Sequence, residues 1–316
     1  MTKAIANALK HGIDDVLVPA VQDAGKTVKK AMHSVADGAE KVAGHAEEAE
    51  SHAVQEFAKA GKDVHASDGR RLGTVATKEE LRKGLGPTPV YKIGDDGVVR
   101  RLTSEGPKAL EEADRARLAP MKLDGADKVP GAEPGKYRLP PLKKGEVRPT
   151  TESEQVPFGE DELSRATQLA RHEDGSFGSY AKREGTGPTA DEPNRPAQYD
   201  FTSNNYASAR YGKAGDENGF ILVGRSRNPN PHSERVLGIP MLESGSAGGL
   251  TAVYTERAPC TSAPNCSSWM KHFLPSGVQV THSASYGGAA DRAAGNSDME
   301  QYLNALRPKP HPQFKP

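Results

Sequence analysis

Apolar residues recur at helical spacing along the first sixty residues of the chain. Ile5, Leu9 and Ile13 follow one another at intervals of four, as on one face of a helix. Pro19 interrupts this pattern, and a narrow, alanine-rich apolar stripe continues through the Ala- and Glu-rich stretch that follows. Such a stripe suits a partner helix better than a globular core. We therefore predict a helical segment over residues 1–60, acting as an adaptor or in export recognition, with a solvated helical hairpin as the alternative.

The next part of the chain shows little periodicity. Two short apolar runs, at residues 90–93 and 98–102, flank a Gly-Asp-Asp-Gly sequence and indicate a small hairpin. Eight prolines then fall between residues 107 and 157 in a charged stretch that is poor in aromatic residues. This is the composition of a linker. We expect a largely irregular, Pro-rich linker over residues 61–157.

Strand and helix patterns alternate in the C-terminal half. The strand patterns cover residues 199–201, 219–224, 250–255 and 278–283, and the helical patterns cover residues 160–171, 233–242, 266–274 and 298–306. From residue 199 onward the order is β-β-α-β-α-β-α, which predicts a sheet with helices packed on it. The expected fold class is α/β, with a compact domain over residues 158–316.

Composition and charge narrow the function classes. Only 35% of the 316 residues are hydrophobic and 5% are aromatic, which fits one compact core accompanied by polar helix and linker. The 42 basic and 42 acidic residues cancel, so a generally polycationic nucleic-acid binder is excluded. The longest apolar run near the start, residues 16–21, is far shorter than the ~20 residues that span a bilayer. We expect no membrane span and, without a signal-peptide pattern, export by a route that uses no cleavable signal peptide.

One imidazole, one carboxylate and two thiols lie where predicted strands give way to predicted helices. They belong to His232, Glu234, Cys260 and Cys266. One His and two Cys leave the fourth tetrahedral position of a zinc ion open, as in catalytic zinc sites, and Glu234 would be free to move protons beside the metal. Residues two apart on a helix point about 200° away from each other. His232 and Glu234 can therefore face one site only if the helix begins there, as Pro231 indicates.

The spacing of the cysteines needs a local break in the chain. On one continuous helix Cys260 and Cys266 would lie ~9 Å apart along the axis, too far for two ligands of one ion. Pro264 allows residues 261–264 to loop out, with Asn265 as the N-cap of a helix that begins at Cys266. The helix dipole would then favour the thiolate of Cys266. A simple disulfide between the two cysteines is the alternative.

Four arginines flank these motifs in the sequence. Arg225, Arg227, Arg235 and Arg257 give modest support to contact with phosphate groups. Trp269, on the second motif helix, is expected to pack in the core.

These motifs resemble the deaminase superfamily, and more closely the bacterial polymorphic-toxin deaminases. The resemblance rests on residues 220–225 (Phe-Ile-Leu-Val-Gly-Arg), residues 232–237 (His-Ser-Glu-Arg-Val-Leu) and residues 255–260 (Thr-Glu-Arg-Ala-Pro-Cys) followed by Cys266. It covers roughly residues 158–316. Five residues separate the cysteines, whereas the commonest deaminase pattern has two.

The resemblance implies a zinc-dependent nucleic acid deaminase. The C-terminal domain would be a three-layer, cytidine deaminase-like arrangement of sheet and helices. His232, Cys260 and Cys266 would hold Zn²⁺, and Glu234 would move protons during hydrolytic deamination of cytosine to uracil or adenine to hypoxanthine. The target base must be unstacked, so the expected substrate is a single-stranded or flipped base, with cytosine in DNA favoured over RNA.

Three functions follow from these observations. The first is a monomeric interbacterial toxin, secreted or delivered into the cytoplasm of a target cell and neutralised by a cognate immunity protein. The second is a deaminase of free nucleosides or nucleotides. The third is a non-enzymatic secreted binding module that a Cys260–Cys266 disulfide stabilises, and this module would contain no stoichiometric zinc.

Overall fold

The computed structural model describes residues 61–187, 191–192, 195–227 and 231–309. By its internal contacts the chain divides into two compact units, Met1–Glu48 and Ala49–Pro316, and the described residues all belong to the second. The helical segment predicted over residues 1–60 lies outside the described residues. None of the described helices combines the length and the apolar character that crossing a membrane requires.

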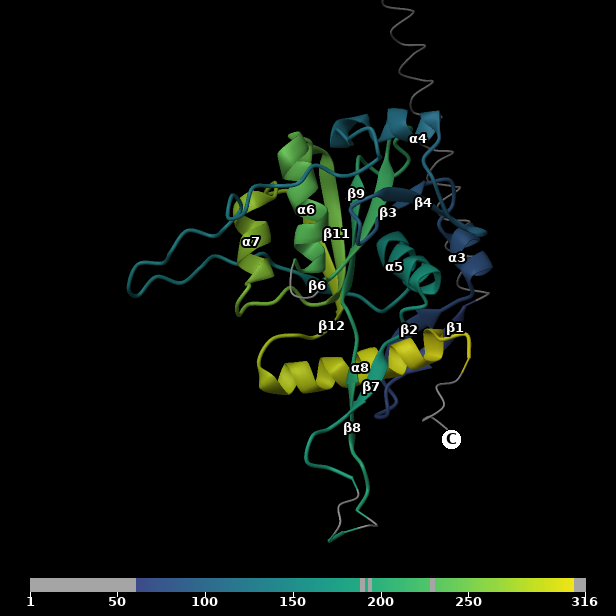
Figure 1. Ribbon diagram of the computed structural model, residues 1–316, viewed down its shortest axis with the longest axis vertical. Helices are drawn as coiled ribbons and strands as arrows, with labels where there is room; N and C mark the ends of the chain where they lie inside the picture. The colour runs from purple at the N-terminus through teal and green to yellow at the C-terminus, as the bar shows by residue number, and fades with distance from the viewer. Residues whose placement is uncertain (1–60, 188–190, 193–194, 228–230, 310–316) are drawn as a thin grey trace, which may run out of the picture. The chain divides into compact units, whose positions relative to one another are not determined.

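A mixed sheet of eight strands forms the centre of the described unit (Figure 1). Its strand order is β5-β4-β3-β10-β9-β11-β12-β6. The strands are β3 (Val90–Ile93), β4 (Val99–Thr103), β5 (Gly106–Lys108), β6 (Glu154–Gln155), β9 (Tyr206–Tyr211), β10 (Phe220–Arg225), β11 (Leu250–Arg257) and β12 (Gln279–Ala284). Strand β9 runs antiparallel to both β10 and β11, whereas β3 pairs in parallel with β10 and β12 in parallel with β11.

Helices cover both faces of this sheet, as the order of the sequence patterns predicts (Figure 1). The described helices are α3 (Lys78–Gly84), α4 (Glu112–Arg117), α5 (Glu162–Asp174), α6 (Ser233–Ser244), α7 (Cys266–Phe273) and α8 (Ala289–Leu306), with short 3-10 turns at Ala119–Met121 and Ala247–Gly249. Side chains on β10 alternate between the two faces. Phe220 and Leu222 pack under α6 and α7, whereas Ile221 and Val223 pack under α5 and α3. The result is an α/β domain in which both faces of the sheet are buried.

A third apolar cluster joins α8 to a hairpin made of β1 (Lys62–His65) and β2 (Arg71–Val75). The rings of Phe158 and Tyr302 stack within it at 3.8 Å between centroids. Gly73 permits this packing, because a Cβ on Gly73 would lie 2.1 Å from the carbonyl oxygen of Phe158. Phe158, at the start of the C-terminal half, thereby packs against the hairpin of β1 and β2.

The predicted linker over residues 61–157 is wrong for residues 61–121. These residues contain five strands and two α-helices, and β3, β4 and β5 extend the main sheet beyond β10. The physical reason is long-range pairing. Val90 lies opposite Ile221 in the sheet, and the local composition around residue 90 cannot indicate a partner strand so far along the chain. The boundary predicted at residue 158 is corrected for the same reason, since strands from before and after it share one sheet.

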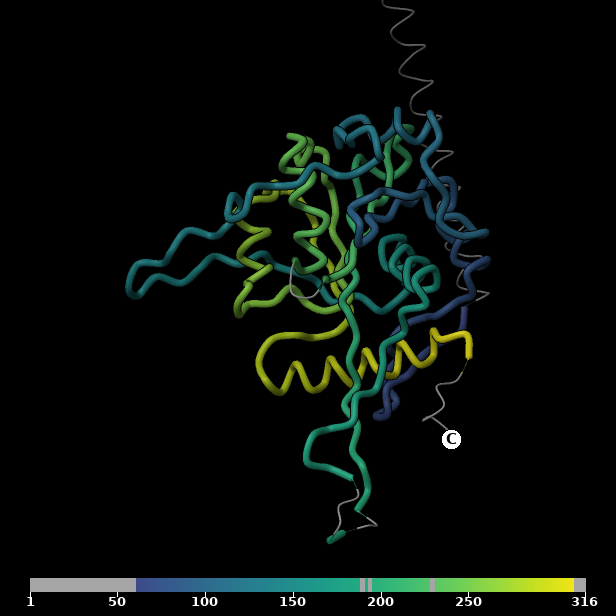
Figure 2. The backbone as a smooth tube through the Cα atoms, viewed as in Figure 1, coloured from purple at the N-terminus to yellow at the C-terminus, as the bar shows by residue number. Residues whose placement is uncertain are grey.

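Residues 122–153, which we call the strap, contain no regular helix or strand, as the proline content predicts. Figure 2 shows the strap passing α6 and α7 before it extends outward as a long loop. Its contacts with the core are specific. Leu123, Val129 and Leu139 pack against the cluster under α6 and α7, and the indole Nε1 of Trp269 donates a hydrogen bond of 3.0 Å to the carbonyl of Tyr137. The indole is fully buried, which confirms the expected core position of Trp269.

The remaining expectations for the C-terminal half need three adjustments. The strand expected at residues 199–201 is β8 (Tyr199–Thr202), which pairs with β7 (Ser179–Lys182) in a separate ribbon rather than in the main sheet. The last helix begins at Ala289, nine residues before the predicted start. Strand β9 has no counterpart among the sequence patterns, because its residues Tyr-Ala-Ser-Ala-Arg-Tyr include small side chains of low strand propensity.

We expect a fragment of residues 158–316 to lack a cooperative unfolding transition. Without β3, the edge of β10 and the apolar side chains beside it would be exposed to water. Circular dichroism during thermal unfolding, together with binding of an apolar dye, provides the measurement. A matched fragment of residues 49–316, cut between the two compact units, should unfold cooperatively. Cooperative unfolding of the shorter fragment would show that the first strands are dispensable.

Candidate metal centre

The side chains of His232, Cys260 and Cys266 meet at one edge of the sheet. One ligand atom from each residue lies within 4.8 Å of the other two, and the Sγ of Cys260 lies 3.9 Å from the Nδ1 of His232. In a tetrahedral zinc site with Zn–N and Zn–S bonds of ~2.1 and ~2.3 Å, ligand atoms lie ~3.5–3.8 Å apart. The three residues therefore have the chemistry and nearly the spacing that Zn²⁺ requires.

His232 and Glu234 can both face this centre because α6 begins between them. His232 is the N-cap residue and has an extended backbone (φ −66°, ψ 157°), and Ser233 is the first helical residue. Glu234 lies in the first turn and is 4% exposed. This is the arrangement expected from Pro231. Side chains two positions apart within a helix point away from each other, but His232 lies outside the helix and Glu234 inside it, so both side chains can face the centre.

The two cysteines are brought together by a loop, as the sequence indicates. Cys260 follows β11, and α7 begins at Cys266 after Asn265, whose side-chain oxygen accepts a hydrogen bond of 3.2 Å from the backbone N–H of Ser268. The backbone N–H of Cys266 donates to the Sγ of Cys260 at 3.2 Å. Both cysteines are free thiols rather than a disulfide.

Burial and hydrogen bonding set the charges at the centre. Burial raises the pKa of Glu234 above its ordinary value, so that its protonated form is accessible nearer to neutral pH. Hydrogen bonds from Cys266 and His232 lower the pKa of Cys260 to about 4, and the hydrogen bond to Cys260 in turn raises the pKa of His232. The hydrogen bond to Cys260, together with burial, raises the pKa of the Cys266 thiol. These shifts favour the thiolate on Cys260 and not on Cys266, where the helix dipole was expected to favour it.

Asn205 connects the centre to two strands. Its Nδ2 donates to the hydroxyl oxygens of Ser233 at 2.9 Å and of Thr255 at 2.7 Å, and its Oδ1 accepts from the backbone N–H of Arg257 at 3.0 Å. The Ser233 hydroxyl donates in turn to Oε2 of Glu234 at 3.2 Å. Asn205 thus positions the start of α6 against the end of β11. Sequence reasoning did not find it, because it precedes the motifs by many residues and belongs to none of them.

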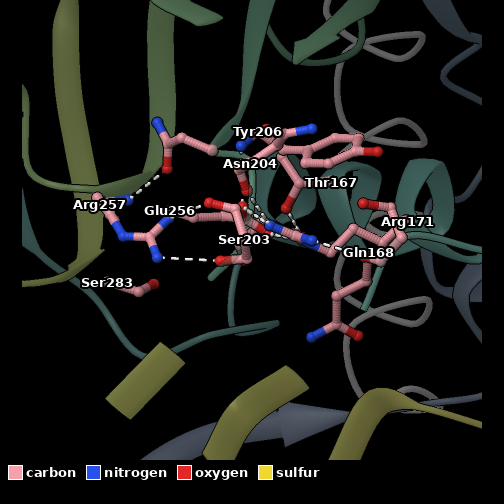
Figure 3. A network of polar contacts seen from close by, with 12 residues as sticks. Thr167, Gln168, Arg171, Ser203, Asn204, Tyr206, Glu256, Arg257 and Ser283 are labelled. Carbon is pink, nitrogen blue, oxygen red and sulfur yellow. Dashed lines mark hydrogen bonds and ion pairs between the residues drawn. The ribbon is translucent and has the colours of Figure 1, made fainter. Parts of the chain in front are cut away.

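A buried ion pair supports the end of β11, close to Cys260 (Figure 3). Arg171 on α5 and Glu256 on β11 are both inaccessible to solvent, and two hydrogen bonds of 2.5 and 2.6 Å join guanidinium to carboxylate. The carboxylate also accepts from the backbone N–H of Tyr206, and the guanidinium donates to the carbonyl of Asn204 at 2.8 Å. The guanidinium of Arg257 contacts the hydroxyl of Ser203 in the same network. These contacts join the helix on one face to the strand that leads into the metal centre.

We expect Arg171→Met to lower the free energy of unfolding by ~3–5 kcal/mol, because the carboxylate of Glu256 would remain buried without its partner. Urea unfolding followed by the fluorescence of Trp269, the only tryptophan, measures this change. Arg183→Met is the control, since the ion pair between Arg183 and Asp200 is about half exposed and should contribute at most ~1 kcal/mol. The double variant R171M/E256Q should be less destabilised than R171M. Equal losses for R171M and R183M would contradict the assigned role of the buried pair.

Comparison with known proteins finds a family likeness in the part of the chain that contains this centre. Residues 202–302 match a family model described as Xanthomonas-like deaminase. The matched range contains β9, β10, β11 and β12 together with His232, Glu234, Cys260 and Cys266. No curated protein and no solved structure matches the chain. Residues 202–302 are therefore similar to a deaminase domain, of a family consistent with a toxin deaminase of the cytidine deaminase-like superfamily.

Proposed function

We propose that this chain is a zinc-dependent hydrolase that deaminates a nucleobase, cytosine to uracil in DNA, and acts as an interbacterial toxin. The observation that carries the proposal is the convergence of His232, Cys260 and Cys266 in a deaminase-family domain, with the buried carboxylate of Glu234 beside them. The sheet covered by helices on both faces supports a cytidine deaminase-like, three-layer fold.

His232, Cys260 and Cys266 are the residues that would hold the metal. When bound by these three ligands, Zn²⁺ would supply Lewis-acid chemistry and lower the pKa of water at its open position. The backbone N–H of Cys266 already donates to Cys260 Sγ, which stabilises that sulfur as a thiolate. With the metal bound, the centre would combine a thiolate ligand with a coordination position left for water.

Glu234 is the proposed proton carrier. It would take a proton from the attacking water as the C–O bond forms and pass it to the ring nitrogen. It would then take the remaining proton from the new hydroxyl group and give it to the amine, so that ammonia leaves as the C–N bond breaks and the C=O bond forms. Its raised pKa, caused by burial, suits a group that both accepts and donates protons. Ser233 donates a hydrogen bond to Oε2, which orients the carboxylate.

The choice of a nucleic acid as substrate is supported by the resemblance to toxin deaminases and by the arginines beside the site. Deamination of free nucleosides or nucleotides is the alternative. Because both cysteines are free thiols, the structure offers no support for the module stabilised by a disulfide. We further propose that the protein acts as a monomer after delivery into the cytoplasm of a target cell, and that a cognate immunity protein blocks its site.

We expect the purified chain to contain one zinc ion per molecule, held through its two thiols. Cys260→Ser and Cys266→Ser should each lose this zinc, because each removes a thiolate ligand. Elemental analysis of the protein after gel filtration measures the metal. Thr261→Ala, in the exposed loop between the cysteines, is the matched control and should retain it. A metal-free wild-type protein whose mass is lower by two hydrogens would indicate the disulfide instead.

We expect Glu234→Gln to lower the rate of deamination by ~10²–10⁴-fold while zinc content and thermal stability stay unchanged, because the amide cannot carry the proton. Single-stranded DNA, duplex DNA, RNA and free deoxycytidine would be incubated in parallel, with sequencing for C-to-T changes and measurement of released ammonia. Glu217→Gln is the control, because Glu217 is an exposed glutamate in the loop between β9 and β10. Full activity of E234Q would remove Glu234 from its assigned role, and turnover of deoxycytidine alone would favour the alternative function.

A further inference from the structure

A groove of about 1100 Å³ lies between α6 and the strap. One wall is formed by Val236, Ile239 and Pro240 of α6, and the opposite wall by the strap around Tyr137 and Leu139. The strap lies outside the range that matches the deaminase family model. The groove is therefore built partly from a segment that the family comparison does not describe.

The groove runs beside the candidate metal centre. Its lining includes Pro231 and Asn265, the residues that immediately precede His232 and Cys266. Arg235, which follows Glu234, also lines it. A ligand that extends out of the metal centre on this side would pass along the groove.

The charge of the groove differs from that of the whole chain. Arg138 and Arg148 of the strap line it together with Arg227 and Arg235, and Glu133 is the only acidic lining residue. The complete chain, by contrast, has a net charge of zero. Positive charge is thus concentrated along one side of the centre, as expected of a surface that binds an anion.

Three of these arginines have no carboxylate partner among the described residues. Arg235 donates to the carbonyl of Pro264 and Arg148 to the carbonyl of Pro140, each at 2.6 Å, and Arg138 forms no ion pair in this part of the chain. Carbonyl acceptors orient a guanidinium without neutralising its charge. Other arginines of the described unit are paired with carboxylates, among them Arg70, Arg71, Arg100, Arg115, Arg171, Arg183 and Arg225. Arginines without a carboxylate partner also occur elsewhere in the described unit, as at Arg117, Arg292 and Arg307, which donate to carbonyl or hydroxyl oxygens. Along the groove, however, three such arginines line one surface.

The strap holds its arginines at a defined position. Lys136 forms an ion pair of 2.8 Å with Glu243 of α6, and the ring of Tyr137 contacts Phe273 of α7 edge-on at 5.5 Å between centroids. The carbonyl of Tyr137 accepts the hydrogen bond from Trp269. The segment next to Arg138 is thus fixed to both helices that begin at the metal centre.

We propose that this groove binds the sugar-phosphate backbone of a single-stranded nucleic acid on one side of the base that enters the metal centre. This inference rests on the proposed function for the identity of its ligand. Guanidinium groups bind phosphate through paired hydrogen bonds, and the apolar and aromatic walls suit sugars and bases. The volume is above the ~300–1000 Å³ typical of small-molecule pockets, which leaves room for more than one nucleotide.

The double variant R138Q/R148Q tests this groove in the full chain. Binding of a fluorescein-labelled single-stranded DNA of about 15 nucleotides, a length on the scale of known single-strand sites, would be measured by anisotropy at several salt concentrations. Glu234→Gln is the background, so that turnover during the measurement is greatly slowed. We expect Kd to rise at least ~10-fold at low salt, and the slope of log Kd against log salt to fall by ~1.4, about 0.7 for each lost phosphate contact.

K143Q/K144Q is the matched control, because it removes two positive charges from exposed positions of the same strap that do not line the groove. Its Kd should change less than ~3-fold, since neither lysine lines the groove and salt screens exposed charges. In the active chain, R138Q/R148Q should keep the wild-type thermal stability and zinc content. It should raise KM for the oligonucleotide and leave kcat within twofold.

Three results would overturn the proposal: an unchanged Kd and salt slope for R138Q/R148Q, an equal loss of binding in K143Q/K144Q, or no binding of the oligonucleotide by the full chain at any salt concentration. The last result would point to an acidic protein partner instead. Failure of the proposed function looks different. If the chain binds the oligonucleotide through Arg138 and Arg148 but releases no ammonia, the proposed binding groove is supported and the proposed deaminase activity is contradicted.

Discussion

Strand β9 determines where the candidate metal centre forms, because it runs antiparallel to both β10 and β11. Its two neighbours must therefore run in the same direction and end at the same edge of the sheet. Helix α6 follows β10 and α7 follows β11, so the amino ends of both helices are brought to that edge. His232 and Cys266 lie at these helix ends, and Cys260 lies in the connection between β11 and α7. The convergence of imidazole and thiols is thus a consequence of strand direction.

The buried pair of Arg171 and Glu256 gives this edge its rigidity at a cost in desolvation. Two fully buried charges offset that cost only if their hydrogen bonds are satisfied, and here the backbone of β9 and the segment before it supply the additional partners. Asn205 acts in the same region through neutral hydrogen bonds and links α6 to β11. The ion pair of Arg171 and Glu256 and the hydrogen bonds of Asn205 therefore hold α5, α6 and β11 together around the candidate metal centre.

The sequence predicted the local chemistry better than the long-range architecture. The start of α6 at Ser233 and of α7 at Cys266 could be predicted, because proline and Asn265 are signals that act within one helical turn. Strand β9 could not, since its alanines and serine carry almost no strand signal although it is central in the sheet. The hairpin at residues 90–103 was recognised but assigned to a linker, because pairing of β3 with β10 joins residues far apart in sequence. Asn205 was missed since its role exists only after β9, α6 and β11 have come together.

Pairing between distant segments also governs the order in which this domain can assemble during synthesis. Strand β3 gains its parallel partner only when Phe220–Arg225 has left the ribosome, and the hairpin of β1 and β2 meets α8 only after residues 289–306 have been made. Contacts of such high contact order form slowly, since loop closure must precede them. Until those segments have been made, the emerging chain holds β3 with only its hairpin partner β4, and the hairpin of β1 and β2 without α8. The candidate metal centre, which needs Cys266, is likewise completed only after most of the chain has been synthesised.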